Sequence, residues 1–139
     1  MKTYQHTQPA ITIIRAMMLM ILIFAIVSIF VHQMLISMIV IGIITWLFRS
    51  LTIEISGTDL TWYFGSGFPL KRVSLNEIVS AEAIQTTVWN GWGIHYTARG
   101  WLYNVSGRGA VAIKLRNGKQ FCLGTDEPEE LAKQFTKRA

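Results

Sequence analysis

The sequence predicts an α+β protein in which an N-terminal transmembrane helical hairpin precedes a small antiparallel β-barrel or sandwich capped by a C-terminal helix. Three observations predict this class. Residues 16–48 contain no Lys, Arg, Asp or Glu. From Leu51 onward, short runs of alternating apolar and polar residues are broken by Gly, Asn and Ser, and the chain ends in an amphipathic pattern. We therefore expect a membrane-anchoring hairpin over residues 1–50 and a cytoplasmic domain over residues 51–139.

The length of the uncharged run favours two helices over one. Its 33 residues would make a single helix about 50 Å long, whereas the hydrocarbon core of a bilayer is about 30 Å thick. We expect a first helix from about Ile11 to Val31 and a second from about Met34 to Phe48, with His32 and Gln33 in the turn. Trp46 would anchor the second helix at the interface. A secretory signal peptide fits poorly, because the run is too long and no small-residue cleavage site follows it.

The basic residues around the hairpin predict its orientation. Lys2 and Arg15 precede the uncharged run, Arg49, Lys71 and Arg72 follow it, and the turn carries no Lys or Arg. By the positive-inside rule, both termini and the C-terminal domain face the cytoplasm. The lone Cys122 agrees with a reducing compartment.

Strand patterns fill the part of the chain that follows the hairpin, about seven in all. Leu51–Ile55 and Leu60–Phe64 alternate on either side of the turn Ser56–Asp59, which predicts a β-hairpin with one buried face. The chain then closes with a helix. Asp126–Glu129 resembles a capping box with Pro in the first turn, and acidic residues there favour the positive end of the helix dipole.

The last β-hairpin can be predicted in register. A three-residue loop at Arg116–Gly118, with Gly118 left-handed, pairs Ile113 with Phe121 and Val111 with Leu123. The alternative two-residue loop at Asn117 and Gly118 does not bury one consistent face. We therefore expect the three-residue loop.

Two segments of this domain resemble a known family. The run from Gly91 to Phe135 looks like the C-terminal part of small, uncharacterised bacterial membrane proteins with a PH-like domain. The run from Leu51 to Glu82, with its Leu75-x-x-Ile78 step, is similar to the first strands of bacterial PH domains. The resemblance implies a PH-like fold behind paired helices in a bacterial inner membrane, and it implies no activity. The loop Ser56–Asp59 carries an acid and no base, which argues against phosphoinositide binding there.

An aromatic and basic group of residues is the candidate contact surface. Large aromatic rings beside Arg are typical of binding hot spots and also of membrane interfaces, and such rings can equally fill a small core. These three interpretations stay open. The candidate residues for contact with a partner or with the membrane surface are Trp89, Trp92, His95, Arg99, Trp101 and Arg108.

The sequence carries no signature of an enzyme, a cofactor site or a metal site. Cys122 and His95 have no visible acidic partner that would support nucleophilic catalysis. From Ser50 onward there are ten basic and eight acidic residues, too even a balance for nucleic-acid binding. We expect no enzyme activity, no cofactor, no metal and no nucleic-acid partner.

These observations lead to two functional hypotheses. The first is a non-catalytic, membrane-anchored module that docks a protein segment or a lipid headgroup at the cytoplasmic membrane surface. The second is an accessory subunit that assembles into a larger membrane complex through its helical hairpin. The expected partners are the lipid bilayer and a membrane or cytoplasmic protein; the sequence does not indicate an oligomeric state.

Overall fold

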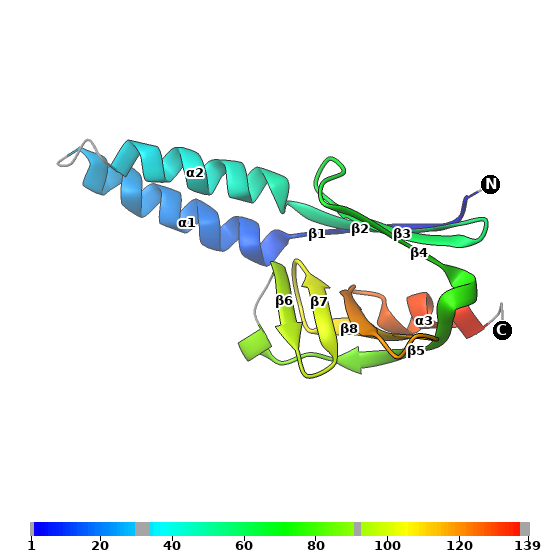
Figure 1. Ribbon diagram of the computed structural model, residues 1–139. Helices are drawn as coiled ribbons and strands as arrows, with labels where there is room; N and C mark the ends of the chain where they lie inside the picture. Colours follow the sequence, from blue (N-terminus) through cyan, green and yellow to red (C-terminus); the bar gives the residue numbers. More distant parts are fainter. Residues whose placement is uncertain (1, 30–33, 91–92, 137–139) are drawn as a thin grey trace.

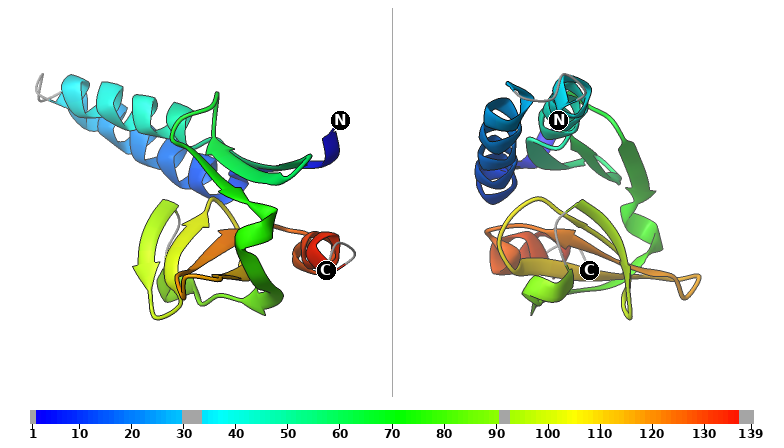
Figure 2. Two further views of the ribbon diagram at one scale, coloured as in Figure 1. Left: turned by 45° about the vertical axis from the view of Figure 1, so that its right-hand side comes forward. Right: turned by 90° about the vertical axis from the view of Figure 1, so that its left-hand side faces the viewer.

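Two β-sheets face each other, and two long helices project from one end of this sandwich (Figure 1). The structure, a computed structural model, describes residues 2–29, 34–90 and 93–136. The α+β class and the C-terminal helix predicted from the sequence are confirmed. Figure 2 shows the helices leaving the sandwich along sheet A and not along sheet B.

Sheet A is an antiparallel meander in the order β1-β2-β3-β4. Its strands are β1 (Lys2–Pro9), β2 (Ser50–Ser56), β3 (Asp59–Phe64) and β4 (Leu70–Ser74). The predicted hairpin is confirmed, since Ser56 pairs with Asp59 and Leu51 with Phe64. The strand β1 was not predicted. It pairs along β2 from Lys2 to Pro9, so part of the segment assigned to the membrane hairpin belongs to the first sheet.

Sheet B contains five strands in the order β5-β8-β9-β7-β6. Its elements are β5 (Ile78–Gln85), β6 (Gly93–Thr97), β7 (Gly100–Asn104), β8 (Gly109–Leu115) and β9 (Gln120–Gly124), with the 3-10 turns η1 (Leu75–Glu77) and η2 (Val88–Asn90). The other described strand pairs are antiparallel, as predicted, but β7 and β9 pair in parallel. The hairpins β6–β7 and β8–β9 join side by side through these two strands. Local turn patterns cannot reveal such a pairing.

The predicted register of the last hairpin is confirmed. Val111 pairs with Leu123 and Ile113 with Phe121. Gly118 has a φ of 83°, the left-handed conformation that the three-residue loop requires and that glycine adopts without steric cost.

Two apolar helices, α1 (Ile11–Ser28) and α2 (Met34–Leu47), lie side by side (Figures 1 and 2). In the described part of the chain, α1 is the one helix long and apolar enough to cross a membrane, and α2 is a shorter apolar helix. The expected turn at His32 and Gln33 lies outside the described residues. Ile13 is the one buried residue of α1, so the helix surface is largely uncovered by the rest of the described structure.

The core lies between the two sheets, and Trp62 is at its centre. The Trp62 ring on β3 stacks on Phe121 of β9 with centroids 4.8 Å apart, and meets Tyr103 of β7 edge-on at 5.4 Å. Only 3% of Trp62 is exposed. Its Nε1–H has no hydrogen-bond partner among the described residues, which makes this buried donor costly to the folded state.

The strand β1 closes one side of the sandwich through the start of α3 (Pro128–Thr136). His6 Nε2 lies 2.6 Å from Asp126 Oδ1, and His6 Nδ1 lies 3.3 Å from Glu127 Oε2. The Tyr4 hydroxyl donates to Glu127 Oε2 at 3.4 Å. Burial and the Glu127 carboxylate together raise the pKa of Tyr4 to about 12.

The helix α3 packs against sheet B, as its apolar spacing predicted. Leu131 is fully buried, and Phe135 packs against the core. Pro128 opens the helix, and the Glu127 N–H donates to Thr125 Oγ1 at 3.1 Å. This bond gives a partner to the Glu127 N–H, at the start of the helix, where N–H groups have no partner within the helix.

Candidate functional site

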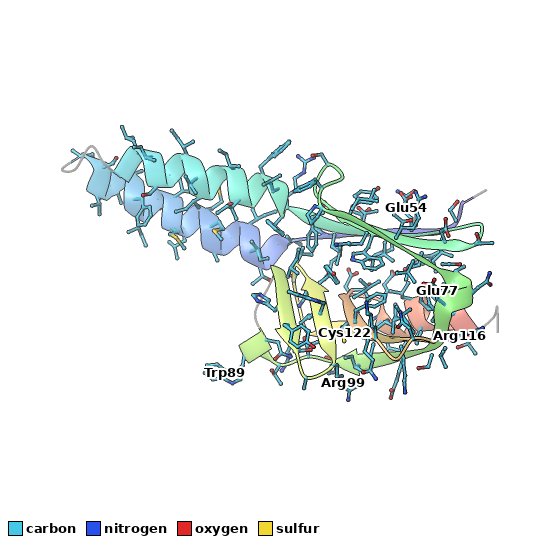
Figure 3. All side chains as sticks on the ribbon, in the orientation of Figure 1. Glu54, Glu77, Trp89, Arg99, Arg116 and Cys122 are labelled. Carbon is cyan, nitrogen blue, oxygen red and sulfur yellow. The ribbon has the colours of Figure 1, made fainter. Side chains whose placement is uncertain are left out.

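The residues that the sequence suggested as a contact surface lie at different places on sheet B. Trp89 lies on η2 and is 94% exposed. Figure 3 shows it at the end of the domain from which the helices project, and shows Arg99, in the β6–β7 turn, well apart from it. Arg108 lies in the loop between β7 and β8, and Trp92 lies outside the described residues. The described members therefore do not form a single cluster.

The remaining two candidates lie on opposite faces of sheet B. Trp101 meets Tyr96 edge-on, with ring centroids 5.4 Å apart, and both rings are exposed. His95 is opposite Leu102, and Leu102 is opposite Cys122, so these three share the other face. His95 and Cys122 are thus two strand spacings apart, about 10 Å. That separation is too long for a Cys–His pair to exchange a proton directly.

The Cys122 thiol is a buried group with little reactivity. It is 2% exposed, and burial raises its pKa, an effect that the positive charge of Arg99 partly opposes. A hollow of about 180 Å³ beside it is lined in part by Leu102 and Arg99. Because the thiolate is the reactive form, this environment favours a structural role for Cys122.

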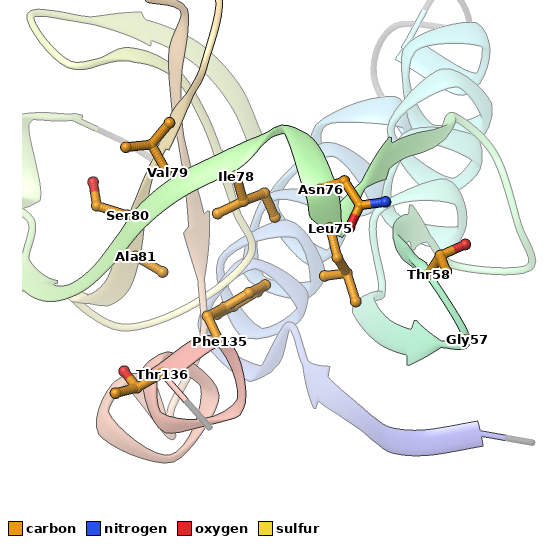
Figure 4. A pocket seen from close by; sticks show the side chains of 10 residues that line it. All are labelled: Gly57, Thr58, Leu75, Asn76, Ile78, Val79, Ser80, Ala81, Phe135 and Thr136. Atoms are coloured by element: carbon orange, nitrogen blue, oxygen red, sulfur yellow. The ribbon is translucent and has the colours of Figure 1, made fainter. Parts of the chain in front are cut away.

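A larger groove lies between α3, the edge of β5 and the β2–β3 turn (Figure 4). Its volume is about 540 Å³. In Figure 4 the side chains of Leu75, Ile78 and Phe135 point into the space between β5 and α3, with Thr58 across from them. The lining residues are Gly57, Thr58, Leu75, Asn76, Ile78, Val79, Ser80, Ala81, Phe135 and Thr136. The groove therefore joins an apolar floor to a rim of hydroxyl and amide groups.

The groove runs along the edge of a strand and not across its face. Four consecutive residues, from Ile78 to Ala81, line it. Successive side chains of a regular strand point to opposite faces, but the pairing of β5 with β8 shifts register between Ile78 and Ser80. The four lining residues therefore follow an irregular stretch of a strand that lies at the edge of its sheet. Within the described sheet β5 has one neighbour, β8. The outer edge of β5 therefore offers backbone N–H and C=O groups to a further strand.

Sequence reasoning did not find this groove. The four-residue spacing of Leu131 and Phe135 indicates that the C-terminal helix docks on a sheet, and the sequence predicts a strand from Ile78 to Val88. Nothing in that run shows that β5 is an edge strand, because its position depends on the pairing of β8 with β9. The groove is thus a product of non-local topology.

The described residues contain no group of three or more His, Cys, Asp or Glu placed to hold a metal ion. Comparison of the chain with protein-family models, with curated proteins and with solved structures finds no match.

Proposed function

We propose that the chain is a non-catalytic, membrane-anchored docking module whose PH-like domain binds an extended segment of a partner protein at the cytoplasmic membrane surface. The observation that carries this proposal is the free edge of β5, which lines a 540 Å³ groove beside α3. A strand edge next to an apolar pocket is a general means of recognising an extended peptide.

The membrane part of the proposal is supported by α1 and α2. The helix α1 is 18 residues long with a mean hydropathy of 2.5, and at about 1.5 Å per residue it is about 27 Å long. Its exposed residues include Leu19, Leu22 and Ile26, each more than half exposed. Side chains of this kind are stable in lipid and costly in water. The insertion of the helix pair as a hairpin and the cytoplasmic placement of the domain form part of this proposal.

The PH-like description is supported by the two facing sheets and by the C-terminal helix packed on the second. Two features add to the simple arrangement expected from the resemblance. One is β1, which extends the first sheet, and the other is the parallel pairing of β7 with β9. Neither feature covers the edge of β5.

The proposed ligand makes two kinds of contact. Its backbone extends sheet B along β5, and one apolar side chain enters the space between Ile78, Ala81 and Phe135. The backbone bonds tolerate many sequences, while the pocket selects an apolar residue at one position. Among the described residues, no charged side chain lines the groove, so we expect the segment's affinity to depend weakly on salt.

Photocrosslinking in native membranes tests the proposal. A benzoylphenylalanine placed at Thr58, in the groove wall, should crosslink a defined partner segment. The same group at Leu70, which is 51% exposed on β4, should not. The crosslinked segment is then synthesised and its affinity for the full chain is measured.

A matched pair of variants sharpens that measurement. Thr136→Arg adds a charge at the groove, at the end of a helix where a cation is tolerated. Thr87→Arg makes the same change at an exposed position outside it. The first should weaken peptide binding about tenfold or more, equivalent to about 1.4 kcal/mol, and the second should not. Equal binding by wild type and Thr136→Arg would rule out the groove.

A second candidate function is that of an accessory subunit that assembles through its helices. Gly42 of α2 has no atom within 4 Å of the position that a Cβ would occupy, so this small residue lies on a face that α1 does not cover. Small residues let membrane helices approach closely. Exchanging α1 and α2 for an unrelated hairpin should abolish assembly under this hypothesis and leave peptide binding in the groove intact under the first.

A further inference from the structure

Basic side chains and exposed aromatic rings lie near the sheet-side ends of the two helices and on loops linked to them. Arg15 lies on α1 and Arg49 lies two residues after the end of α2; both are exposed. The Arg49 guanidinium lies over the Trp46 ring, 5.6 Å from its centroid. We define the collar as Arg15, Trp46, Arg49, Phe68, Trp89 and Arg108.

Hydrogen bonds tie the distant members of the collar to the helix base. Thr12 Oγ1 on α1 lies 3.1 Å from Ser106 Oγ, in the loop between β7 and β8. Two residues along this loop, the Arg108 carbonyl accepts from the Thr86 N–H at 2.6 Å and from Thr86 Oγ1 at 3.1 Å. Thr86 precedes η2, which carries Trp89. These hydrogen bonds link α1 to the loop between β7 and β8, and link that loop to Thr86, two residues before η2.

The loop between β3 and β4 holds the collar's remaining aromatic ring, that of Phe68. The Gly65 N–H in this loop donates to the Ser50 carbonyl at 2.9 Å. A Cβ at Gly65 would meet the Leu47 carbonyl at the end of α2. Phe68 is 72% exposed, so the loop whose Gly65 approaches the end of α2 also carries an exposed apolar ring.

The collar has one sign of charge and carries a large exposed aromatic surface. Trp46 is 53% exposed and Trp89 is 94% exposed. The eight acidic residues of the chain lie elsewhere: Glu54, Asp59, Glu77, Glu82, Asp126, Glu127, Glu129 and Glu130. Figure 3 shows Trp89 on the side of the domain toward which the helices project. Arg and Trp side chains near the ends of membrane-spanning helices are typical of surfaces that contact lipid phosphates and the headgroup region.

We propose that the collar binds the headgroups of anionic lipids, so that the domain lies flat on the leaflet with Trp89 and Phe68 in the interface. The inference rests on the proposed insertion of α1, because that insertion places the leaflet at the helix base. It adds a function for residues that the groove does not use. Bound in this way, the domain holds the edge of β5 in a fixed orientation relative to the membrane.

Spin labelling of the full chain in lipid nanodiscs tests this proposal. In a Cys122→Ala background, which removes the only cysteine, a nitroxide is attached at Val88, which is 68% exposed on η2. A second label at Lys119, in the β8–β9 turn, is the control. The measurement is the ratio of collision with oxygen to collision with a water-soluble nickel chelate. In bilayers with phosphatidylglycerol we expect the Val88 label, and not the Lys119 label, to become shielded from the chelate.

Lipid composition and one matched pair of variants then identify the cause. The Val88 label should be less shielded from the chelate in bilayers of phosphatidylcholine alone. Arg108→Gln keeps the carbonyl that binds Thr86 and should lower the ratio of docked to undocked domain about fivefold, the usual effect of one cation at an anionic surface. Arg99→Gln makes the same change at the distant β6–β7 turn and should have no effect.

Three results would overturn the proposal. The first is that the chelate reaches the Val88 label as readily as the Lys119 label in every bilayer; the collar would then be a surface for a protein partner and not for lipid. The second is equal docking in both lipid compositions. The third is an equal effect of the two arginine variants. None of these bears on peptide binding at β5, so failure of the collar and failure of the groove are distinguishable.

Discussion

Sheet A and sheet B are held in place by different means. The strands β1 and β2 continue directly into α1 and α2, and the Ala10 N–H donates to the Arg49 carbonyl at 2.8 Å where the helices meet the sheet. Sheet B has no such continuity. Side-chain packing, hydrogen bonds and the connection through η1 fix it to the rest of the molecule. The position of sheet A thus follows from the covalent chain, whereas that of sheet B depends on individual contacts that mutations can remove.

The largest expected effect comes from breaking the central contact between the sheets. Trp62→Ala removes the ring that packs on Phe121 and Tyr103 and leaves a cavity, so we expect a loss of about 3–5 kcal/mol in the free energy of unfolding. Urea denaturation of the full chain in detergent, followed by near-UV circular dichroism, measures it. Trp62→Phe is the matched control. It keeps an aromatic ring and removes the unpaired Nε1–H, so its loss should be much smaller; equal losses would contradict the packing argument.

Two glycine-to-alanine substitutions, one in each sheet, distinguish the response of sheet B from that of sheet A. Gly100 and Gly57 both have positive φ, 91° and 59°, so Ala at either position is strained by about 1–2 kcal/mol. A Cβ at Gly100 would also overlap the backbone carbonyl of Gln120 on β9, whereas at Gly57 nothing lies within 4 Å. Gly100→Ala should therefore cost more and should disturb β7 and β9.

Hydrogen exchange of the two variants measures this difference region by region. In Gly100→Ala, protection should fall in sheet B and persist in β1 and β2. Gly57→Ala should affect the β2–β3 turn alone. Uniform loss of protection in both sheets would show that they do not respond separately.

The same contrast explains how much of the fold the sequence predicts. The β2–β3 hairpin and the β8–β9 register follow from turn residues and from alternation over a few neighbours, and both are confirmed. The parallel pair β7–β9 and the strand β1 are not predictable in this way. The segment Lys2–Pro9 has weak apolar alternation and is a strand because β2, more than forty residues away in sequence, pairs with it. Loop-closing pairings of this kind depend on the whole topology.

The candidate site, like the fold, is only partly predictable from the sequence. The exposed state of Trp89 agrees with a contact surface, but sequence could not show that Arg108 is linked through Thr86 to η2. Nor could it show that Arg99 belongs to another part of the domain. Composition indicates residue types suited to binding; which of them lie together is set by the pairing of distant strands.

A third and smaller effect concerns the contact that closes the sandwich beside β1. His6 lies 2.6 Å from Asp126 Oδ1, and its side chain is 21% exposed while that of Asp126 is 55% exposed. For a partly exposed pair, we expect a coupling free energy of about 0.5–1 kcal/mol. A double-mutant cycle with His6→Ala and Asp126→Ala measures it. Additive losses would show that β1 is held by its pairing with β2 and not by this contact.

The smallest effect is confined to alkaline pH and tests the neighbouring contact of Tyr4 with Glu127. Because the pKa of Tyr4 is raised from 10.0 to about 12 in the folded chain, its contribution to stability is complete below pH 10. That contribution is lost as pH rises from 10 to about 12, since the unfolded chain ionises first. At pH 11 the loss should be under about 1 kcal/mol, after allowance for solvent screening of a partly exposed ring.

Urea denaturation at pH 8 and pH 11 should show a smaller alkaline loss in Tyr4→Phe than in wild type. Glu127→Gln removes the negative charge that adds to the effect of burial, so it should give an intermediate loss. An alkaline loss unchanged in Tyr4→Phe would assign the effect to other groups and would leave β1 without a measurable role in joining the sheets at this point.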